Sequence, residues 1–99
     1  TGAVELGIAS GVFANDEVLP HALEVAHDIA VNTAPVSVAL SKRLLWESFA
    51  MTAEQMNQAE SDLHVHLMGK ADAREGVNSY LERREPQWSL SVNKDYPEF

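Results

Sequence analysis

The sequence predicts an all-α fold: an orthogonal bundle of about four helices with a short irregular N-terminal segment and an extended C-terminal tail. Three observations predict it. Apolar residues recur at helical spacing over most of residues 16–84, Pro and Gly residues separate the periodic segments, and two segments have the spacing of a helix capping box. A chain of 99 residues is expected to form one domain, residues 1–99.

The first long helix is predicted over about residues 16–32, after an irregular entry. Gly7 suits a helix end that is followed by a short extended piece. Asn15 or Asp16 is the expected N-cap, and the helix should stop before Pro35, which disfavours helical angles at the preceding residue. One apolar stripe follows the helical period: Leu19, Ala22, Leu23, Ala26, Ile29 and Ala30.

The second and third helices are predicted over about residues 35–49 and 53–69. Pro35 suits the first helical position, where its missing N–H has little effect. Thr52 and Gln55 have capping-box spacing, and Gly69 is a plausible C-cap. The apolar positions of the two helices are Val36, Ala39, Leu40 and Leu44 in one, and Met56, Ala59, Leu63 and Leu67 in the other.

The fourth helix is predicted over about residues 73–84, with a capping box formed by Asp72 and Glu75, and it should end before Pro86. The remaining tail, residues 85–99, has no sustained period. Trp88 and Tyr96 are its expected anchors, so the tail should lie on another surface rather than fold alone.

Charge and composition narrow the classes of ligand. The net charge of −8 argues against a nucleic-acid surface. All seven basic residues lie between Lys42 and Lys94, so an anionic ligand is expected in the second half. No apolar run approaches the ~20 residues of a membrane span, and we expect no signal peptide, because the first residues lack its basic-then-apolar pattern. The absence of cysteine excludes disulfides and thiolate metal sites, and we expect a cytoplasmic protein.

We expect neither a metal site nor a catalytic carboxylate in these residues. His64 and His66 are two positions apart, so they do not share a helix face and cannot chelate an ion together. Glu75 is assigned a capping role, and Glu47 and Glu60 have no oxyanion-type Gly-rich turn near them in sequence. Lys42 and Arg43 are read as solvated or interface residues.

Two segments resemble the enoyl-CoA hydratase/isomerase, or crotonase, family. The first includes Leu6-Gly7, Val12-Phe13, the helix from Leu19 to Ala30, Pro35 and Lys42-Arg43. The second, from Asp72 to Trp88, is more specific: it is similar to the family's ending D-x-x-E-G-x-x-A-F-x-E-K-R-x-P-x-F/W. Tyr80 stands for the common Phe, and Arg83 for the common Lys.

The resemblance implies the C-terminal helical domain of a crotonase fold, from an enzyme that acts on 2-enoyl-CoA thioesters in fatty-acid or related acyl-CoA metabolism. The family's oxyanion-hole amides and catalytic Glu residues belong to a preceding β/α core, so this chain alone is expected to be inactive. The family assembles as trimers or dimers of trimers, and these helices contribute to that interface.

The resemblance also carries two positions over as ligand contacts. Tyr80 and Arg83 match the places near the adenine and phosphate of coenzyme A, which is bound as a thioester substrate rather than as a resident cofactor. At helical spacing Tyr80, Arg83 and Arg84 could share one face, where a ring can stack on a purine and a guanidinium can grip a phosphate. The alternative is that Tyr80 packs in the core and both arginines are solvated near a helix C-terminus.

Two other functions stay open from the sequence. One is a standalone helical protein-interaction module without catalytic activity. The other is a small acyl-CoA-binding helical protein, which would need a complete pocket. A piece of a larger fold should expose apolar patches and associate, and Trp46, Phe49, Met51 and Met56 are candidates for such an interface.

Overall fold

The structure, a computed structural model, describes residues 2–98; Thr1 and Phe99, the ends of the predicted domain and tail, lie outside the described residues. No strand occurs between residues 2 and 98, so the predicted all-α class is confirmed. The elements are α1 (Gly2–Glu5), α2 (Val18–Asn32), α3 (Pro35–Glu47), the 3-10 turn η1 (Ser48–Ala50), α4 (Ala53–Met68), α5 (Ala71–Glu82) and α6 (Val92–Asp95).

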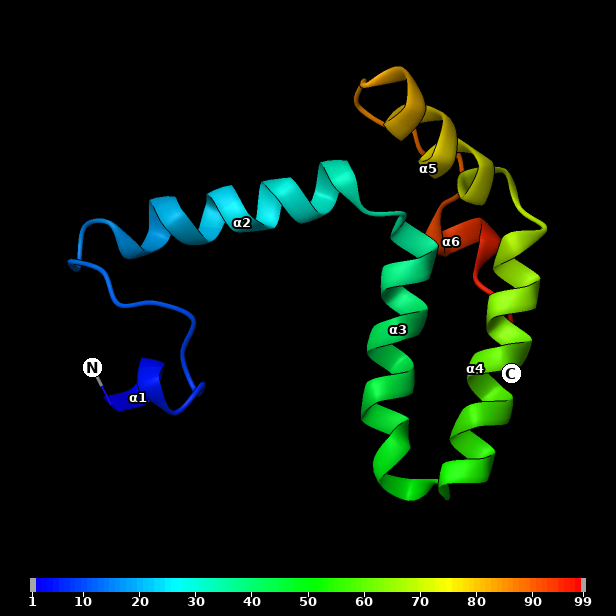
Figure 1. The fold of residues 1–99 in the computed structure, drawn as a ribbon, viewed down its shortest axis with the longest axis horizontal. Coiled ribbons are helices and arrows are strands. Elements are labelled where there is room, and N and C mark those ends of the chain that lie inside the picture. The colour runs from blue at the N-terminus through cyan, green and yellow to red at the C-terminus, as the bar shows by residue number, and fades with distance from the viewer. Residues whose placement is uncertain (1, 99) are drawn as a thin grey trace.

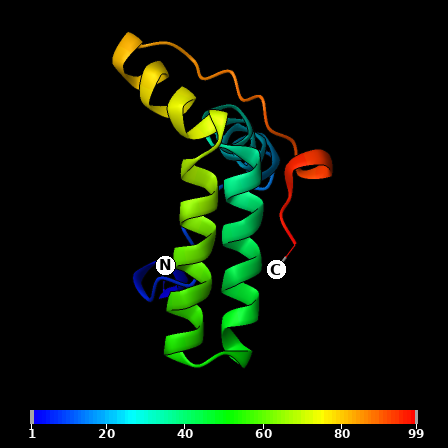
Figure 2. The same ribbon diagram turned by 90° about the vertical axis from the view of Figure 1, so that its right-hand side faces the viewer.

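The core lies in a helical hairpin. Helices α3 and α4 run antiparallel side by side, and α5 extends at an angle from the open end of this pair (Figures 1 and 2). The expected apolar positions of both helices, except Ala39, are confirmed as core or as residues packed on it, and Ala39 is half-buried outside this cluster. The buried residues are Val36, Leu40, Leu44 and Leu63, and the half-buried residues against them are Met56, Ala59, Leu67, Leu90 and Tyr96.

The turn of the hairpin follows the local sequence closely. The predicted second helix ends two residues early, because Ser48–Ala50 tighten into the 3-10 turn. The Thr52 N–H donates to Gln55 Oε1 at 2.9 Å, and the Gln55 N–H donates to Thr52 Oγ1 at 3.1 Å. The predicted capping box at the start of α4 is therefore confirmed, and Gly69 is the C-cap as expected.

Helix α2 stands apart from this core. It leads away from the start of α3 (Figure 1), and none of its residues is buried. Its apolar stripe is exposed to solvent: the exposed fraction is 59% for Leu23 and 66% for Leu19. How four helices would pack as an orthogonal bundle therefore stays a prediction, because α2 contributes nothing to the core described here.

The N-cap predicted for α2 is wrong. Glu17, not Asn15 or Asp16, is the N-cap, and it makes no side-chain capping bond. A turn precedes the helix, in which the Glu17 N–H donates to the Ala14 carbonyl at 2.9 Å, so the helix begins later than residue 16. Before this turn, α1 ends near Gly7, whose φ of 73° fits the expected helix end.

The C-terminal tail lies on the helices through both expected anchors. The Trp88 indole N–H donates to the Val31 carbonyl at 3.0 Å, and Tyr96 packs against the core. Arg43 lies 5.8 Å from the Tyr96 ring centroid, and its Nε donates to Glu47 at 2.8 Å. Arg43 thus helps hold the tail on α3. Among residues 2–98, no helix is long and apolar enough to cross a membrane.

Candidate functional site

The site predicted from sequence lies at the C-terminal end of α5. This helix spans Ala71–Glu82 rather than residues 73–84. It ends at Glu82 because Arg83 adopts the left-handed conformation, with φ 55° and ψ 47°. The Arg84 N–H donates to the Ser79 carbonyl at 3.0 Å, and the Arg83 N–H donates to the Tyr80 carbonyl at 3.2 Å. This pair of bonds is a Schellman motif, with arginine at the position that glycine usually takes.

The turn, and not a helix face, brings the predicted contact residues together. Arg83 and Arg84 lie beyond the end of α5, so the expectation that they share a face with Tyr80 by helical spacing is wrong. All three nevertheless line one surface hollow of about 380 Å³, together with Ser79 and Leu81. Tyr80 is 83% exposed, so the alternative in which it packs in the core of this chain does not hold.

The two arginines differ in their partners. Arg84 Nη1 donates to Glu75 Oε1 at 2.5 Å, and Arg84 Nε donates to Glu82 Oε2 at 2.6 Å. Arg83 has no ion-pair partner among residues 2–98. The hydrogen bond from Arg84 lowers the pKa of Glu75, and the same contact raises the pKa of Arg84. Arg83 is thus the cation available to a ligand in the hollow.

The capping box predicted from Asp72 and Glu75 is wrong. Lys70 is the N-cap of α5 and makes no side-chain capping bond. Glu75 instead pairs with Arg84 and accepts the Gln87 N–H at 3.4 Å. Both carboxylates are therefore used by residues that follow the helix, so the local pattern alone could not assign them.

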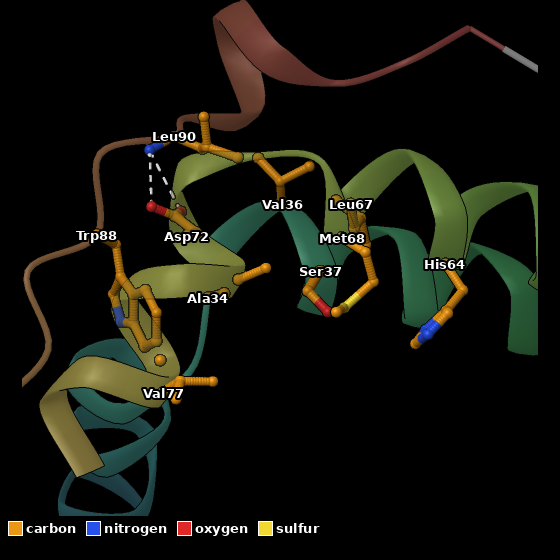
Figure 3. Close-up of a pocket in the computed structure, with 12 residues that line it drawn as sticks. Ala34, Val36, Ser37, His64, Leu67, Met68, Asp72, Val77, Trp88 and Leu90 are labelled. Atoms are coloured by element: carbon orange, nitrogen blue, oxygen red, sulfur yellow. Dashed lines mark hydrogen bonds between the residues drawn. The ribbon is translucent and has the colours of Figure 1, made fainter. Parts of the chain in front are cut away.

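Asp72 fixes the tail at the other end of α5. Its side chain is buried, at 5% exposure, and Oδ1 accepts the Ser89 N–H at 2.8 Å and the Ser89 hydroxyl at 3.2 Å. Oδ2 accepts the Leu90 N–H at 3.3 Å (Figure 3). A carboxylate that receives several donors in this way is a strong tether for an otherwise irregular segment.

An apolar cavity of about 370 Å³ lies beside this tether, and sequence reasoning did not anticipate it. Figure 3 shows Trp88 and Val77 on one side of it and Met68 and His64 on the other. The Trp88 ring lies 3.7 Å from where a β-carbon on Gly76 would be. The only sequence signal was Trp88 as a tail anchor. The other lining residues are Ala34, Val36, Ser37, Leu67, Asp72, Ala73, Gly76 and Leu90.

The remaining candidate residues are spread over separate surfaces. His64 lines the apolar cavity and His66 lines a different hollow, as expected for residues two apart on a helix. No cluster of three His, Asp or Glu side chains able to hold a metal ion occurs among residues 2–98. Glu47 is paired with Arg43.

Comparisons with known proteins agree on one family. The profile of the family described as "Enoyl-CoA hydratase/isomerase" matches residues 1–91. "Enoyl-CoA hydratase AKT3-2" from Alternaria alternata is 38% identical over 102 aligned residues, which cover 95% of this chain and 34% of that protein.

Two solved structures have the same arrangement of helices. A probable enoyl-CoA hydratase/isomerase from Mycobacterium abscessus superposes with a TM-score of 0.83 at 43% identity, covering 90% of this chain and 35% of that one. An enoyl-CoA hydratase from Polaromonas sp. JS666 gives 0.78 at 28% identity, covering 88% and 34%. The chain thus spans about a third of the length of the relatives that it matches. With residues 1–91 matched by the family profile, the chain belongs to the enoyl-CoA hydratase/isomerase family.

Proposed function

We propose that this chain is the C-terminal helical part of an enzyme that hydrates or isomerises 2-enoyl-CoA thioesters, and that it forms one wall of the coenzyme A pocket. The family membership and the span of about a third of its relatives' length support this proposal. The catalytic groups are then supplied from outside these 99 residues, in a cytoplasmic enzyme of fatty-acid or related acyl-CoA metabolism. The chain alone has no turnover.

The observation that carries the proposed ligand contact is the hollow at the end of α5. An exposed ring at Tyr80 and an unpaired guanidinium at Arg83 line the same hollow. Tyr80 can stack on the adenine, and Arg83 can donate to a phosphate. The 3′-phosphate of coenzyme A is the expected partner, because a phosphate monoester carries close to two charges at neutral pH.

Oligomer contact is the second part of the proposal. Large apolar side chains lie exposed near the turn of the α3–α4 hairpin: the exposed fraction is 71% for Trp46 and 87% for Phe49. Exposed apolar surface of this kind is typical of a face that another chain covers. We propose that it contributes to a homo-oligomer, as a trimer or a dimer of trimers. Sedimentation of a Phe49→Ser variant tests this, and a variant that keeps the oligomer intact would contradict it.

The first test is the length of the encoded protein. An upstream extension of ~150–160 residues, about one further domain, is expected. A reading frame without such an extension would overturn the proposal. It would favour the standalone helical interaction module, for which we would expect a defined protein partner and no affinity for coenzyme A.

The second test uses the full-length enzyme. Arg83→Ala should raise KM for crotonyl-CoA about tenfold, the equivalent of one charge-assisted hydrogen bond, and leave KM for crotonyl-pantetheine unchanged. Pantetheine lacks the adenosine and its phosphates, so it isolates the proposed contact. Arg74→Ala is the matched control, because Arg74 is an exposed cation of α5 that does not line the hollow.

Three outcomes would contradict the proposal. One is turnover of crotonyl-CoA by residues 1–99 alone, which would mean that the chain is a complete enzyme. Another is a rise in KM for both substrates in Arg83→Ala, which would mean that Arg83 acts only on the fold. The third is micromolar binding of coenzyme A by residues 1–99 alone, which would favour the small acyl-CoA-binding protein.

A further inference from the structure

The turn that presents Arg83 has an unusual backbone. Arg83 is the one non-glycine residue with positive φ among residues 2–98. A side chain in the left-handed region is disfavoured, and such a residue persists only when the surrounding structure holds it there. Glycine would adopt this conformation without strain, so an arginine here suggests that the side chain itself is needed.

Arg84 supplies the contacts that hold the turn. Its guanidinium reaches back nine residues to Glu75 and also donates to Glu82, while its Nη1 donates to the Glu85 carbonyl at 3.1 Å. Glu75 in turn accepts the Gln87 N–H at 3.4 Å. Two ion pairs of Arg84, with Glu75 and Glu82, and the hydrogen bond from Gln87 to Glu75 thus hold the chain after the turn against α5.

The same contacts decide which arginine can meet an anion. Two carboxylates neutralise Arg84, and the group formed by Glu75, Glu82 and Arg84 has a net charge of −1. This group does not attract a phosphate by charge alone. Binding in the hollow therefore depends on where the guanidinium of Arg83 is placed, and the turn sets that place.

We propose that Glu75 and Arg84 act as a positioning pair, which holds the left-handed turn and so presents Arg83 to the phosphate of the bound thioester. This inference rests on the proposed function. It assigns no contact with the ligand to Glu75, which acts through Arg84 and Arg83.

The test measures the affinity of the full-length enzyme for coenzyme A and for dephospho-coenzyme A, which lacks the 3′-phosphate. The affinity for coenzyme A divided by the affinity for dephospho-coenzyme A measures the contribution of the 3′-phosphate contact alone. Glu75→Gln keeps the shape of the side chain and removes its charge, and it should lower this ratio about three- to tenfold. Glu60→Gln, an exposed glutamate of α4, is the matched control and should leave the ratio at its wild-type value.

A double-mutant cycle completes the experiment. If Glu75 acts through Arg83, the Glu75→Gln/Arg83→Ala variant should have the same ratio as Arg83→Ala alone. Glu75→Asp, which keeps the charge, should retain part of the wild-type ratio. Circular dichroism and thermal unfolding of each variant show that the protein is still folded.

The outcomes separate this inference from the proposed function. If the wild-type enzyme binds both ligands with equal affinity, the proposed phosphate contact is wrong, and the inference of a positioning pair is wrong with it. A wild-type enzyme that prefers coenzyme A, with an unchanged ratio in Glu75→Gln, would overturn only the positioning pair. Equal losses of affinity for both ligands in Glu75→Gln would also overturn it, since they indicate a general effect on the fold.

Discussion

The α3–α4 hairpin and helix α2 have similar apolar periodicity but opposite environments. The hairpin buries its apolar face, with Val36 at 1% exposure and Leu40 at 2%. Helix α2 has an apolar stripe of comparable length, yet none of its residues is buried. In the hairpin, α3 and α4 cover each other's apolar face, whereas α2 leads away from the core (Figure 1).

This difference shows what periodicity can and cannot predict. The period fixes which face of a helix is apolar, and it leaves open what covers that face. For α3 and α4 the covering helix follows directly in sequence, through a turn and a capping box. An apolar face that stays exposed is typical of a surface covered by another domain or chain. The exposed face of α2 therefore agrees with the proposal that the chain is part of a larger protein.

The largest expected effect is in the hairpin core. Leu40→Ala should lower the free energy of unfolding by about 2–5 kcal/mol, because it removes buried methyl groups and leaves a cavity. Leu23→Ala, the same change on the exposed face of α2, should alter it by less than about 0.5 kcal/mol. Urea unfolding of residues 1–99 followed by circular dichroism measures both. If both variants lose the same free energy of unfolding, then α2 is packed and does not differ from the hairpin in this respect.

The tail should depend on Asp72. Asp72→Ala removes the acceptor for Ser89 and Leu90, and it should cost about 1–3 kcal/mol by leaving these groups unpaired. Hydrogen exchange at the Ser89 and Leu90 amides should speed up in this variant. Asp62→Ala is the control, since the exposed Asp62 carboxylate receives only the Gln58 side chain. Unchanged exchange in Asp72→Ala would show that Trp88 and Tyr96 hold the tail without it.

Short-range features could be predicted from sequence. Thr52 and Gln55 form the expected capping box, and Gly69 ends α4, because the groups involved lie within a few residues of one another. The buried positions Leu40 and Leu63 also follow from the helical period. Each of these is decided locally or between two consecutive helices.

Long-range partners could not be predicted. The segment from Asp72 to Glu75 has the same capping spacing as the Thr52 box, yet both carboxylates bind residues of the tail or turn. Nothing in the sequence of α5 indicates that Ser89 will donate hydrogen bonds to Asp72. In the candidate site, the family resemblance predicts Tyr80 and Arg83. The hollow that both residues line depends on a left-handed arginine, which local preferences disfavour.

Loss of the capping box at Thr52 should have a smaller effect on stability than loss of a buried core side chain. Thr52→Ala should lower the free energy of unfolding by about 1 kcal/mol, since the Gln55 N–H loses its acceptor at the start of a packed helix. Thr33→Ala, at the end of α2, should change it by less than about 0.5 kcal/mol, because α2 adds no buried side chain to the core. Thermal unfolding of the two variants measures the difference. A loss in Thr33→Ala as large as in Thr52→Ala would indicate that α2 unfolds together with the hairpin.

The smallest expected effect is the pH dependence of the turn after α5. Arg84 donates to Glu75 and lowers the pKa of that carboxyl below its ordinary value of 4.5. The contribution of a group with a lowered pKa is fully present above the unfolded value and is lost as pH falls through the folded value. The turn at Arg83 should therefore loosen only in acid below about pH 4.5, while the hairpin core around Leu40 keeps its structure. NMR signals of the Arg84 side-chain N–H and the Gln87 amide should move together in this range, and the Gln87 signal should stay flat in Glu75→Gln. If those signals titrate in Glu75→Gln as in the wild type, Glu75 does not control the turn.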